Sequence, residues 1–166
     1  MSKTAFVFPG QGSQYVGMGK DLYDEFPAAK KLYEEADETL GFPISELSFE
    51  GDPDILTQTR NAQPAILLHS IAVLTILAEE SDLKPAVTAG HSLGEYVAAC
   101  FAGVFSLEDA LKLVAGRARL MQQMPPNGVM AAVFAPADRV EAALGAHEGR
   151  VVIAAFNGPE NTVISG

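Results

Sequence analysis

The sequence predicts an α/β fold, and three patterns support this assignment. Two short apolar runs, Thr4–Phe8 and Ala86–Ala89, each lead into a turn that contains glycine, as buried strands do. A helix-forming stretch, Glu95–Ala102, follows the second run closely. After Gly128, strand patterns enclose one short helical pattern. Strands that alternate with helices in this way form a sheet with helices packed on it.

The first strand leads into the loop Pro9–Gln14, whose two glycines allow the backbone to approach a ligand closely. The backbone N–H of Gln11, which lies between them, is therefore a candidate donor to an oxyanion. A phosphate-binding loop is excluded, because neither G-x-x-x-x-G-K-[ST] nor G-x-G-x-x-G follows the strand.

The longest apolar run, Ala65–Ala78, is predicted to be a buried core helix that begins at Pro64 and ends at Glu79. The run is too short to span a membrane, so no membrane association is expected. His69 lies inside it, where a hydrogen-bonded core histidine is a better interpretation than a ligand. No metal site is expected in the chain.

The segment Gly90–Gly94 has the G-x-S-x-G pattern of a nucleophile elbow, a sharp turn from a strand into a helix. Such a turn exposes the hydroxyl of Ser92, which is the candidate covalent nucleophile. The backbone N–H of Leu93 then points to where an oxyanion would form. The alternative is an ordinary strand-to-helix connection. His91 is interpreted as a residue that shapes the site, because adjacent side chains in an extended turn point apart.

Ser106–Asp109 has the pattern of a capping box that opens a helix. The apolar stripe of this helix is expected to consist of Leu107, Ala110, Leu111, Val114, Ala118 and Met121. Arg117 borders the stripe, whereas Lys112 and Arg119 fall on the far side. An arginine at the border can turn its planar fork inward and bind a carboxylate through two hydrogen bonds. The alternative is an arginine that lies along the protein surface.

Pro125–Gly128 is predicted to be a linker, because two prolines and a glycine break the preceding helix. Beyond it, the patterns predict strands at 129–134, 151–156 and 162–165 and a helix at 137–144. This is a strand-helix-strand-strand unit. We therefore expect two domains, at residues 1–124 and 125–166.

Composition and charge exclude several classes of function. A net charge of −10 argues against nucleic-acid binding, because phosphate contacts need a basic stripe. The single cysteine, Cys100, excludes an internal disulfide and is expected to be a small buried core residue. No signal-peptide pattern precedes the first strand, so we expect a cytoplasmic protein.

Five segments together resemble the malonyl-CoA:acyl carrier protein transacylases and the acyltransferase domains of polyketide and fatty acid synthases. They are Phe8–Gln14, Asn61–Ala65, Gly90–Tyr96, Arg117–Gln122 and Asn157–Gly166. Their order and their spread over the chain make the match specific. The resemblance implies that a serine takes an acyl group from coenzyme A and passes it to the phosphopantetheine thiol of an acyl carrier protein.

The resemblance also assigns roles to individual residues. Ser92 would be the nucleophile, and the Gln11 and Leu93 amides would form the oxyanion hole. Arg117 would bind the free carboxylate of malonyl-CoA, and Leu93 resembles the residue in malonyl-using members. His91 and Gln63 would lie against the substrate. No bound cofactor is implied, because the coenzyme A thioester is the substrate.

The family fold is an α/β-hydrolase-like large subdomain with an inserted ferredoxin-like small subdomain. On this template, residues 1–124 are the first part of the large subdomain, and residues 125–166 are an incomplete small subdomain. The family's catalytic histidine lies well downstream of its serine, and the neighbours of His147 do not match its motif. We therefore expect that this chain lacks the C-terminal half of the domain, with the catalytic base, which would be its partner.

Two other functions stay open. A hydrolase of the same family, with a proofreading role, would share the elbow and pass the acyl group from a thioester to water. A non-catalytic fragment would bind acyl thioesters or a partner without turnover. Exposure to malonyl-CoA separates the three functions. A transacylase would keep a persistent acyl adduct, a hydrolase would release coenzyme A and free malonate, and a non-catalytic fragment would do neither.

Overall fold

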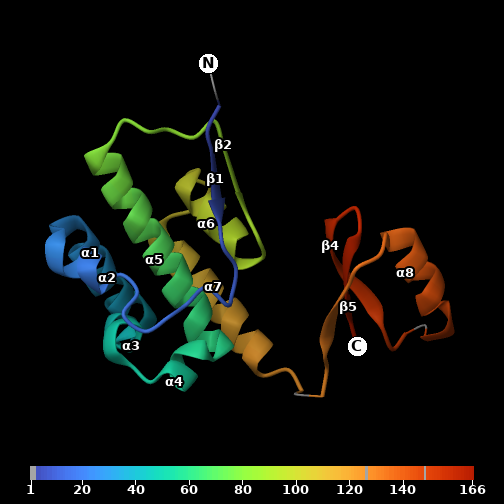
Figure 1. Cartoon of the computed structure of the whole chain (residues 1–166). Helices are drawn as coiled ribbons and strands as arrows, with labels where there is room; N and C mark the ends of the chain where they lie inside the picture. Colours follow the sequence, from blue (N-terminus) through green and yellow to red (C-terminus); the bar gives the residue numbers. More distant parts are fainter. Residues whose placement is uncertain (1–2, 126, 148) are drawn as a thin grey trace. The chain divides into compact units, whose positions relative to one another are not determined.

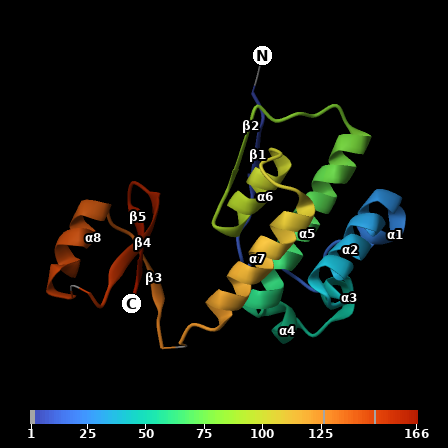
Figure 2. The same ribbon diagram turned by 180° about the vertical axis from the view of Figure 1, so that it is seen from behind.

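The computed structural model describes residues 3–125, 127–147 and 149–166. They form two units, one that ends at Gln123 and one that runs from Met124 to Gly166. Figure 1 and Figure 2 show these units from opposite sides. The α/β class is confirmed. Pro126 in the predicted linker and Glu148 beside His147 lie outside the described residues.

The first unit contains a parallel pair of strands and a set of helices. In chain order its elements are β1 (Ala5–Phe8), α1 (Lys20–Glu25), α2 (Pro27–Leu40), α3 (Ile44–Glu50), α4 (Pro53–Thr57), α5 (Thr59–Glu80), β2 (Val87–Gly90), α6 (Leu93–Phe101) and α7 (Leu107–Gln122). Phe8 at the end of β1 lies opposite Gly90 at the end of β2. The loops that follow both strands therefore meet at the same edge of the sheet.

Helix α5 forms the centre of the first unit. It contacts α2, α6 and α7, and it lies between α2 and α7 in Figure 1. The core-helix prediction for Ala65–Ala78 is confirmed, but the predicted start at Pro64 is wrong. The helix begins at Thr59, because the carbonyl of Gln58 already accepts hydrogen bonds from the N–H groups of residues 61 and 62. Pro64 lies inside the helix, where it has no N–H to donate to the carbonyl four residues earlier.

The helix that contains Ala65–Ala78 is longer than this run, so the prediction that it is too short to span a membrane is wrong. Helix α5 has 22 residues and is long and apolar enough, by length and composition, to cross a membrane. Its most apolar window is 67% buried inside the described structure. This burial is typical of the core helix of a folded unit.

His69 is not the hydrogen-bonded residue that the sequence predicts. Its Nδ1 atom is buried without a hydrogen-bond partner among the described residues, and so is the hydroxyl of Tyr33. A Cβ on Gly19 would lie 2.9 Å from His69 Nδ1, so the backbone of Gly19 packs against the ring. The residues one turn away on α5, Ala65 and Val73, are apolar and offer no partner. Burial lowers the pKa of His69, so its imidazole is neutral near pH 7.

Residues Lys20–Thr57 form helices α1 to α4, which the strand and elbow patterns do not predict. Local signals for them are nevertheless present in the sequence. Pro27 opens α2, and Gly41 ends it with φ of 72°. Asp52 caps α4, because its Oδ1 accepts a hydrogen bond from the Asp54 N–H at 2.8 Å. Helices α2, α3 and α4 all contact α5 and so complete the core on that side.

Helix α6 begins at Leu93, earlier than the predicted Glu95, because Ser92 is already its N-cap residue. Cys100, near the end of α6, packs against the core but is only partly buried, so the prediction of a buried cysteine holds in part. Burial raises the pKa of its thiol, which disfavours the reactive thiolate.

Helix α7 begins as predicted, because Ser106 Oγ accepts a hydrogen bond from the Asp109 N–H at 3.1 Å. Four residues of the predicted stripe are buried: Ala110, Leu111, Val114 and Ala118. Met121 is 46% exposed, so its placement in the stripe is wrong. It lies in the last turn of α7, where its sulfur accepts a hydrogen bond from Gln63 Nε2 at 3.5 Å.

The second unit has the predicted strand-helix-strand-strand order. Its elements are β3 (Met130–Val133), α8 (Ala137–Leu144), a 3-10 turn (Gly145–His147), β4 (Val152–Gly158) and β5 (Asn161–Ser165). The strands form an antiparallel sheet in the order β3-β5-β4. Thr162 is fully buried in it, and its hydroxyl donates to the Ala135 carbonyl at 3.1 Å.

Candidate active site

Ser92 occupies the turn between β2 and α6 in a strained backbone conformation. Its φ is 52° and its ψ is −102°, and among the described residues it is the only one other than glycine with a positive φ. Such a conformation costs about 1–3 kcal/mol, and strain of this kind concentrates at functional sites. Ser92 is exposed at the N-terminus of α6. These are the features of a nucleophile elbow.

Gly90 and Gly94 have no side chain because the backbone passes very close to itself at this turn. A Cβ on Gly90 would overlap the carbonyl group of Gly94, and a Cβ on Gly94 would overlap the carbonyl oxygen of Phe8. Neither position accepts a side chain unless the backbone moves. The two glycines therefore allow the elbow to pack directly against the end of β1.

Glu95 and His91 surround the elbow without contacting the serine hydroxyl. Glu95 Oε1 accepts a hydrogen bond from the Gly90 N–H at 3.0 Å. His91 Nδ1 would lie 3.1 Å from a Cβ on Gly10, so the imidazole faces the loop after β1. Within the described residues, no hydrogen bond joins the His91 and Ser92 side chains. His91 thus packs against Gly10, in the loop after β1.

Arg117 is half-buried on α7, and its guanidinium points to Ser92. Its Nη2 atom donates to Ser92 Oγ at 2.9 Å, and its Nη1 atom donates to Gln63 Oε1 at 2.5 Å. The guanidinium also lies over the ring of Tyr96, 5.4 Å from the ring centroid. No carboxylate of the described residues lies within ion-pair distance of it. A cation held in this way is ready to bind an anionic group.

Gln63 connects Arg117 to the loop after β1. Its side chain is almost fully buried, and its Nε2 atom donates to Gln11 Oε1 at 3.2 Å. Gln11 Nε2 in turn donates to the hydroxyl of Thr59, at the start of α5, at 3.1 Å. One continuous chain of hydrogen bonds therefore runs from the arginine to the first turn of α5.

The loop after β1 is also held by its own polar groups. The Gly12 N–H donates to Gln14 Oε1 at 2.8 Å, and Ser13 Oγ donates to the Gly10 carbonyl at 3.0 Å. Gly12 has φ of 108°, which a residue with a Cβ rarely adopts. The loop thus has a defined shape although it contains no helix or strand.

The two predicted oxyanion donors are the backbone N–H groups of Gln11 and Leu93. Neither donates a hydrogen bond within the described part of the chain, so both are available to a bound oxygen. In that same part, no histidine or carboxylate accepts a hydrogen bond from the Ser92 hydroxyl. His147 belongs to the second unit, where its Nδ1 atom is 3.3 Å from Arg150 Nη2. The described residues of the first unit thus bring together a serine hydroxyl, free N–H donors and a cation, and none of them accepts a hydrogen bond from that hydroxyl.

The structure brings all six predicted site residues together and adds two others. The predicted residues in contact with one another or adjacent in the turn are Gln11, Gln63, His91, Ser92, Leu93 and Arg117. Tyr96 was not predicted, although it lies one helical turn beyond Ser92. Thr59 has no local signal, because its partner Gln11 is 48 positions away.

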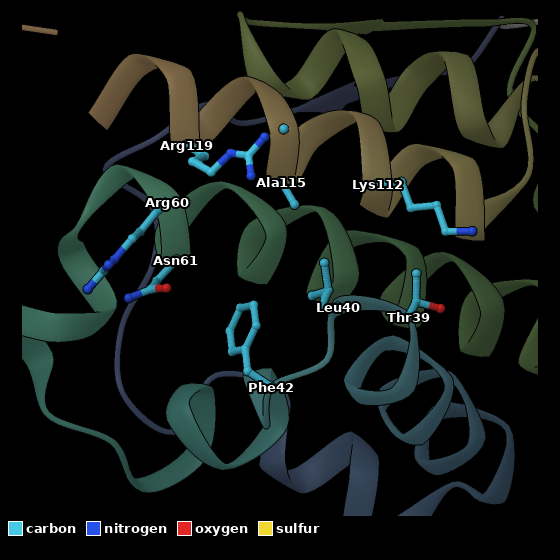
Figure 3. Close-up of a pocket in the computed structure, with 9 residues that line it drawn as sticks. Thr39, Leu40, Phe42, Arg60, Asn61, Lys112, Ala115 and Arg119 are labelled. Atoms are coloured by element: carbon cyan, nitrogen blue, oxygen red, sulfur yellow. The ribbon is translucent and has the colours of Figure 1, made fainter. Parts of the chain in front are cut away.

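A pocket of about 570 Å³ lies between α2, α5 and α7 and is lined by none of these residues (Figure 3). Arg60 and Arg119 lie at one end of it, and the ring of Phe42 faces it from below in this view. Lys112 and Arg119 are exposed, as their positions on the helix predict. The pocket is therefore separate from the nucleophile.

Residues 5–166 match the family model of the acyl transferase domain. The malonyl CoA-acyl carrier protein transacylase of Bacillus subtilis (strain 168) is 51% identical over 172 residues. The match covers 100% of this chain and 54% of that relative. The chain therefore spans about half the length of the curated relative it matches.

Solved structures of malonyl transacylases also match this chain. The crystal structure of a malonyl CoA-acyl carrier protein transacylase from Clostridium perfringens matches with a TM-score of 0.91 and 36% identity, over 99% of this chain and 54% of that one. A type II PKS acyl-carrier protein in complex with its malonyl-transacylase (PlMCAT:AntF) matches with a TM-score of 0.89 and 36% identity. That match covers 99% of this chain and 55% of the other.

Proposed function

The chain belongs to the acyl transferase domain family, and from this premise we propose that it provides the nucleophile and the carboxylate-binding site of a malonyl-CoA:acyl carrier protein transacylase. One observation carries the proposal: Ser92 Oγ, on a strained elbow, lies 2.9 Å from the guanidinium of Arg117. A nucleophile beside a cation that has no ion-pair partner among the described residues suits an acyl group that carries a second carboxylate. The names of the relatives support the choice of acyl donor and acceptor.

In the first half-reaction, Ser92 Oγ attacks the thioester carbonyl carbon of malonyl-CoA. The C–O bond forms and the C–S bond breaks, while the serine proton passes by way of a base to the sulfur of coenzyme A. The N–H groups of Gln11 and Leu93 stabilise the negative charge on the carbonyl oxygen. The phosphopantetheine thiol of the carrier then attacks the malonyl-serine, and its proton returns to Ser92 by way of the same base.

Arg117 selects the acyl group in this proposal. A guanidinium has five N–H donors, and the bonds to Ser92 Oγ and Gln63 Oε1 leave the others available. The malonyl carboxylate would bind to these donors in the planar, bidentate manner that arginine favours. An acetyl group has no carboxylate, so it gains nothing from this cation.

The two units are proposed to be the first parts of an α/β-hydrolase-like large subdomain and of a ferredoxin-like small subdomain. The strands of the first unit leave apolar side chains uncovered, since Val7 is 73% exposed and Val87 is 62% exposed. A two-stranded sheet is marginally stable without further strands or cover. The C-terminal half of a transacylase would cover these side chains and supply the base for Ser92.

An acyl-transfer assay tests the proposed function. The fusion enzyme for this assay is the present chain continued by the C-terminal residues of the Bacillus subtilis relative that lie beyond the match. With malonyl-CoA and a carrier protein that bears phosphopantetheine, we expect malonyl on the carrier, detected by intact-protein mass spectrometry. A carrier without the phosphopantetheine arm is the control and should stay unmodified, because it has no acceptor thiol.

The other outcomes of this assay identify the alternative functions. Release of coenzyme A and free malonate, with the carrier unmodified, would identify a hydrolase. Binding of malonyl-CoA without release of coenzyme A would identify a non-catalytic protein. Either result contradicts the transacylase.

A further inference from the structure

Four side chains link Arg117 to the loop after β1 through three hydrogen bonds. Arg117 Nη1 donates to Gln63 Oε1 at 2.5 Å. Gln63 Nε2 donates to Gln11 Oε1 at 3.2 Å, and Gln11 Nε2 donates to Thr59 Oγ1 at 3.1 Å. The bonded residues are 54, 52 and 48 positions apart in the sequence. Only the tertiary structure brings them together, so the linkage is not a local feature of one helix or turn.

The chemistry of arginine fixes the direction of every bond in this linkage. A guanidinium has donors and no acceptor, so Gln63 must turn its carbonyl oxygen toward Arg117. The amide nitrogen of Gln63 then faces Gln11, which must present its own carbonyl oxygen. The amide nitrogen of Gln11 is left to face Thr59, whose hydroxyl can accept. The orientation of Gln11 therefore depends on both ends of the linkage.

Burial makes the middle of the linkage sensitive to the loss of a partner. Gln63 is only 1% exposed, so water cannot readily replace a lost hydrogen bond of its amide. Its Nε2 atom has Met121 Sδ, at 3.5 Å, as a second and weaker acceptor. If Gln11 moves, Gln63 retains only this weak acceptor, and its bond to Arg117 is then free to reorient.

Glycines flank Gln11 on both sides, and the hydrogen bonds of the loop hold Gly10 and Gly12 but not the N–H of Gln11 itself. Gly12, with φ of 108°, lies outside helical and strand geometry. The hydrogen bonds of the Gln11 side chain therefore help to hold its backbone, whose N–H is the proposed oxyanion donor. A shift of this side chain moves that N–H relative to Ser92 Oγ.

We propose that Thr59 is a positioning residue that, through Gln11 and Gln63, ties the oxyanion donor and the carboxylate-binding Arg117 into one unit. This inference rests on the proposed function, which assigns the oxyanion donor to Gln11 and the carboxylate-binding site to Arg117. A carboxylate on Arg117 then steadies the Gln11 N–H, and removal of the Thr59 hydroxyl weakens carboxylate binding from a distance. In this proposal Thr59 acts on the substrate only through Gln11 and Gln63.

The test uses the fusion enzyme, in which the strands of the first unit are covered, and follows NMR signals of the side-chain N–H groups. Without ligand, Thr59→Val is expected to shift the side-chain amide signals of Gln11 and Gln63 and also the Nε–H signal of Arg117. Thr59→Ser keeps the hydroxyl and should restore all three signals. A shift at Gln11 alone, with Gln63 and Arg117 unchanged, would overturn the inference.

Thr75→Val is the matched control, because it makes the same substitution at another threonine of α5. Thr75 Oγ1 donates to the Ile71 carbonyl at 2.9 Å, and it forms no hydrogen bond with Gln11, Gln63 or Arg117. Its removal should leave the signals of Gln11, Gln63 and Arg117 unchanged. If Thr75→Val shifts them as much as Thr59→Val does, the effect is a general disturbance of α5 and the inference is wrong.

A second arm titrates each variant with malonate and follows the Nε–H signal of Arg117. Loss of one neutral hydrogen bond corresponds to a rise of about threefold to tenfold in the malonate Kd of Thr59→Val, which Thr59→Ser should reverse. An unchanged Kd would contradict the coupling. If malonate does not perturb Arg117 even in the unaltered fusion enzyme, the carboxylate site of the proposed function fails, and the ligand-free arm still decides the role of Thr59.

Discussion

Replacing Arg117 with alanine in the fusion enzyme is expected to abolish most malonyl transfer and to reduce acetyl transfer far less. Truncation leaves the malonyl carboxylate without the cation that lies 2.9 Å from Ser92 Oγ. The loss of transition-state stabilisation for malonyl should be about 2 to 5 kcal/mol, as for one partner of a desolvated charge pair. The measurement is kcat/KM for malonyl-CoA and for acetyl-CoA, from which the two losses are compared.

Arg119→Ala is the matched control for this comparison. It removes the same charge from the same helix, but Arg119 is exposed and lies at the separate pocket in Figure 3. Neither substrate should be affected by it. Equal losses for malonyl and acetyl in Arg117→Ala would show that Arg117 has a structural role only.

Gly90→Ala is expected to destabilise the first unit severely, because the added Cβ would overlap the carbonyl group of Gly94. The clash is between backbone atoms, so no flexible side chain can relieve it. A loss of more than about 3 kcal/mol is expected, above the usual cost of overpacking. Urea unfolding of the fusion enzyme, followed by circular dichroism, measures this change in the free energy of unfolding.

Gly116→Ala is expected to change the stability of the same protein in the opposite direction. Gly116 lies inside α7, and no atom lies within 4 Å of a Cβ at this position, apart from its own helix and chain neighbours. Glycine inside a helix is destabilising by roughly 0.5–1 kcal/mol relative to alanine, so this variant should gain about that much. A small loss in Gly90→Ala, similar in size to the change in Gly116→Ala, would contradict the tight packing of the elbow.

The sequence was sufficient to predict the elbow because its signals are local. The strand that ends at Gly90, the serine and the helix that follows occupy consecutive positions, and each has a recognisable pattern. The capping box at Ser106 succeeded for the same reason. The helix Ala137–Leu144 was predicted with the bounds that the structure has.

The hydrogen-bond partners of the site could not be predicted from local patterns. Arg117 contacts Gln63 and Ser92 across 54 and 25 positions, and Gln11 contacts Thr59 across 48. Periodicity predicts that Arg117 borders the apolar stripe of its helix, but a helical pattern does not predict the atoms that its guanidinium contacts. Which atoms it reaches depends on how α5, α6 and α7 pack.

The errors have physical causes as well. Proline favours the first turn of a helix, so the sequence predicts a start at Pro64, yet α5 begins at Thr59 and already buries Asn61–Gln63 before the proline. Met121 fits the apolar periodicity, but the last turn of α7 has no neighbour that covers it fully. His69 was expected to find a partner, and helix packing left its Nδ1 atom buried without one among the described residues.

The role of Ser92 is tested most directly by incubation with malonyl-CoA followed by peptide mapping by mass spectrometry. In the fusion enzyme, we expect a malonyl adduct on the peptide that contains Ser92, and none in Ser92→Ala. The 166-residue chain alone should form the adduct slowly or not at all, because a serine hydroxyl is a weak nucleophile without an adjacent base. His147→Ala should leave that slow rate unchanged. An adduct that persists in Ser92→Ala would contradict the role of Ser92, and rapid turnover by the chain alone, lost in His147→Ala, would make His147 the base.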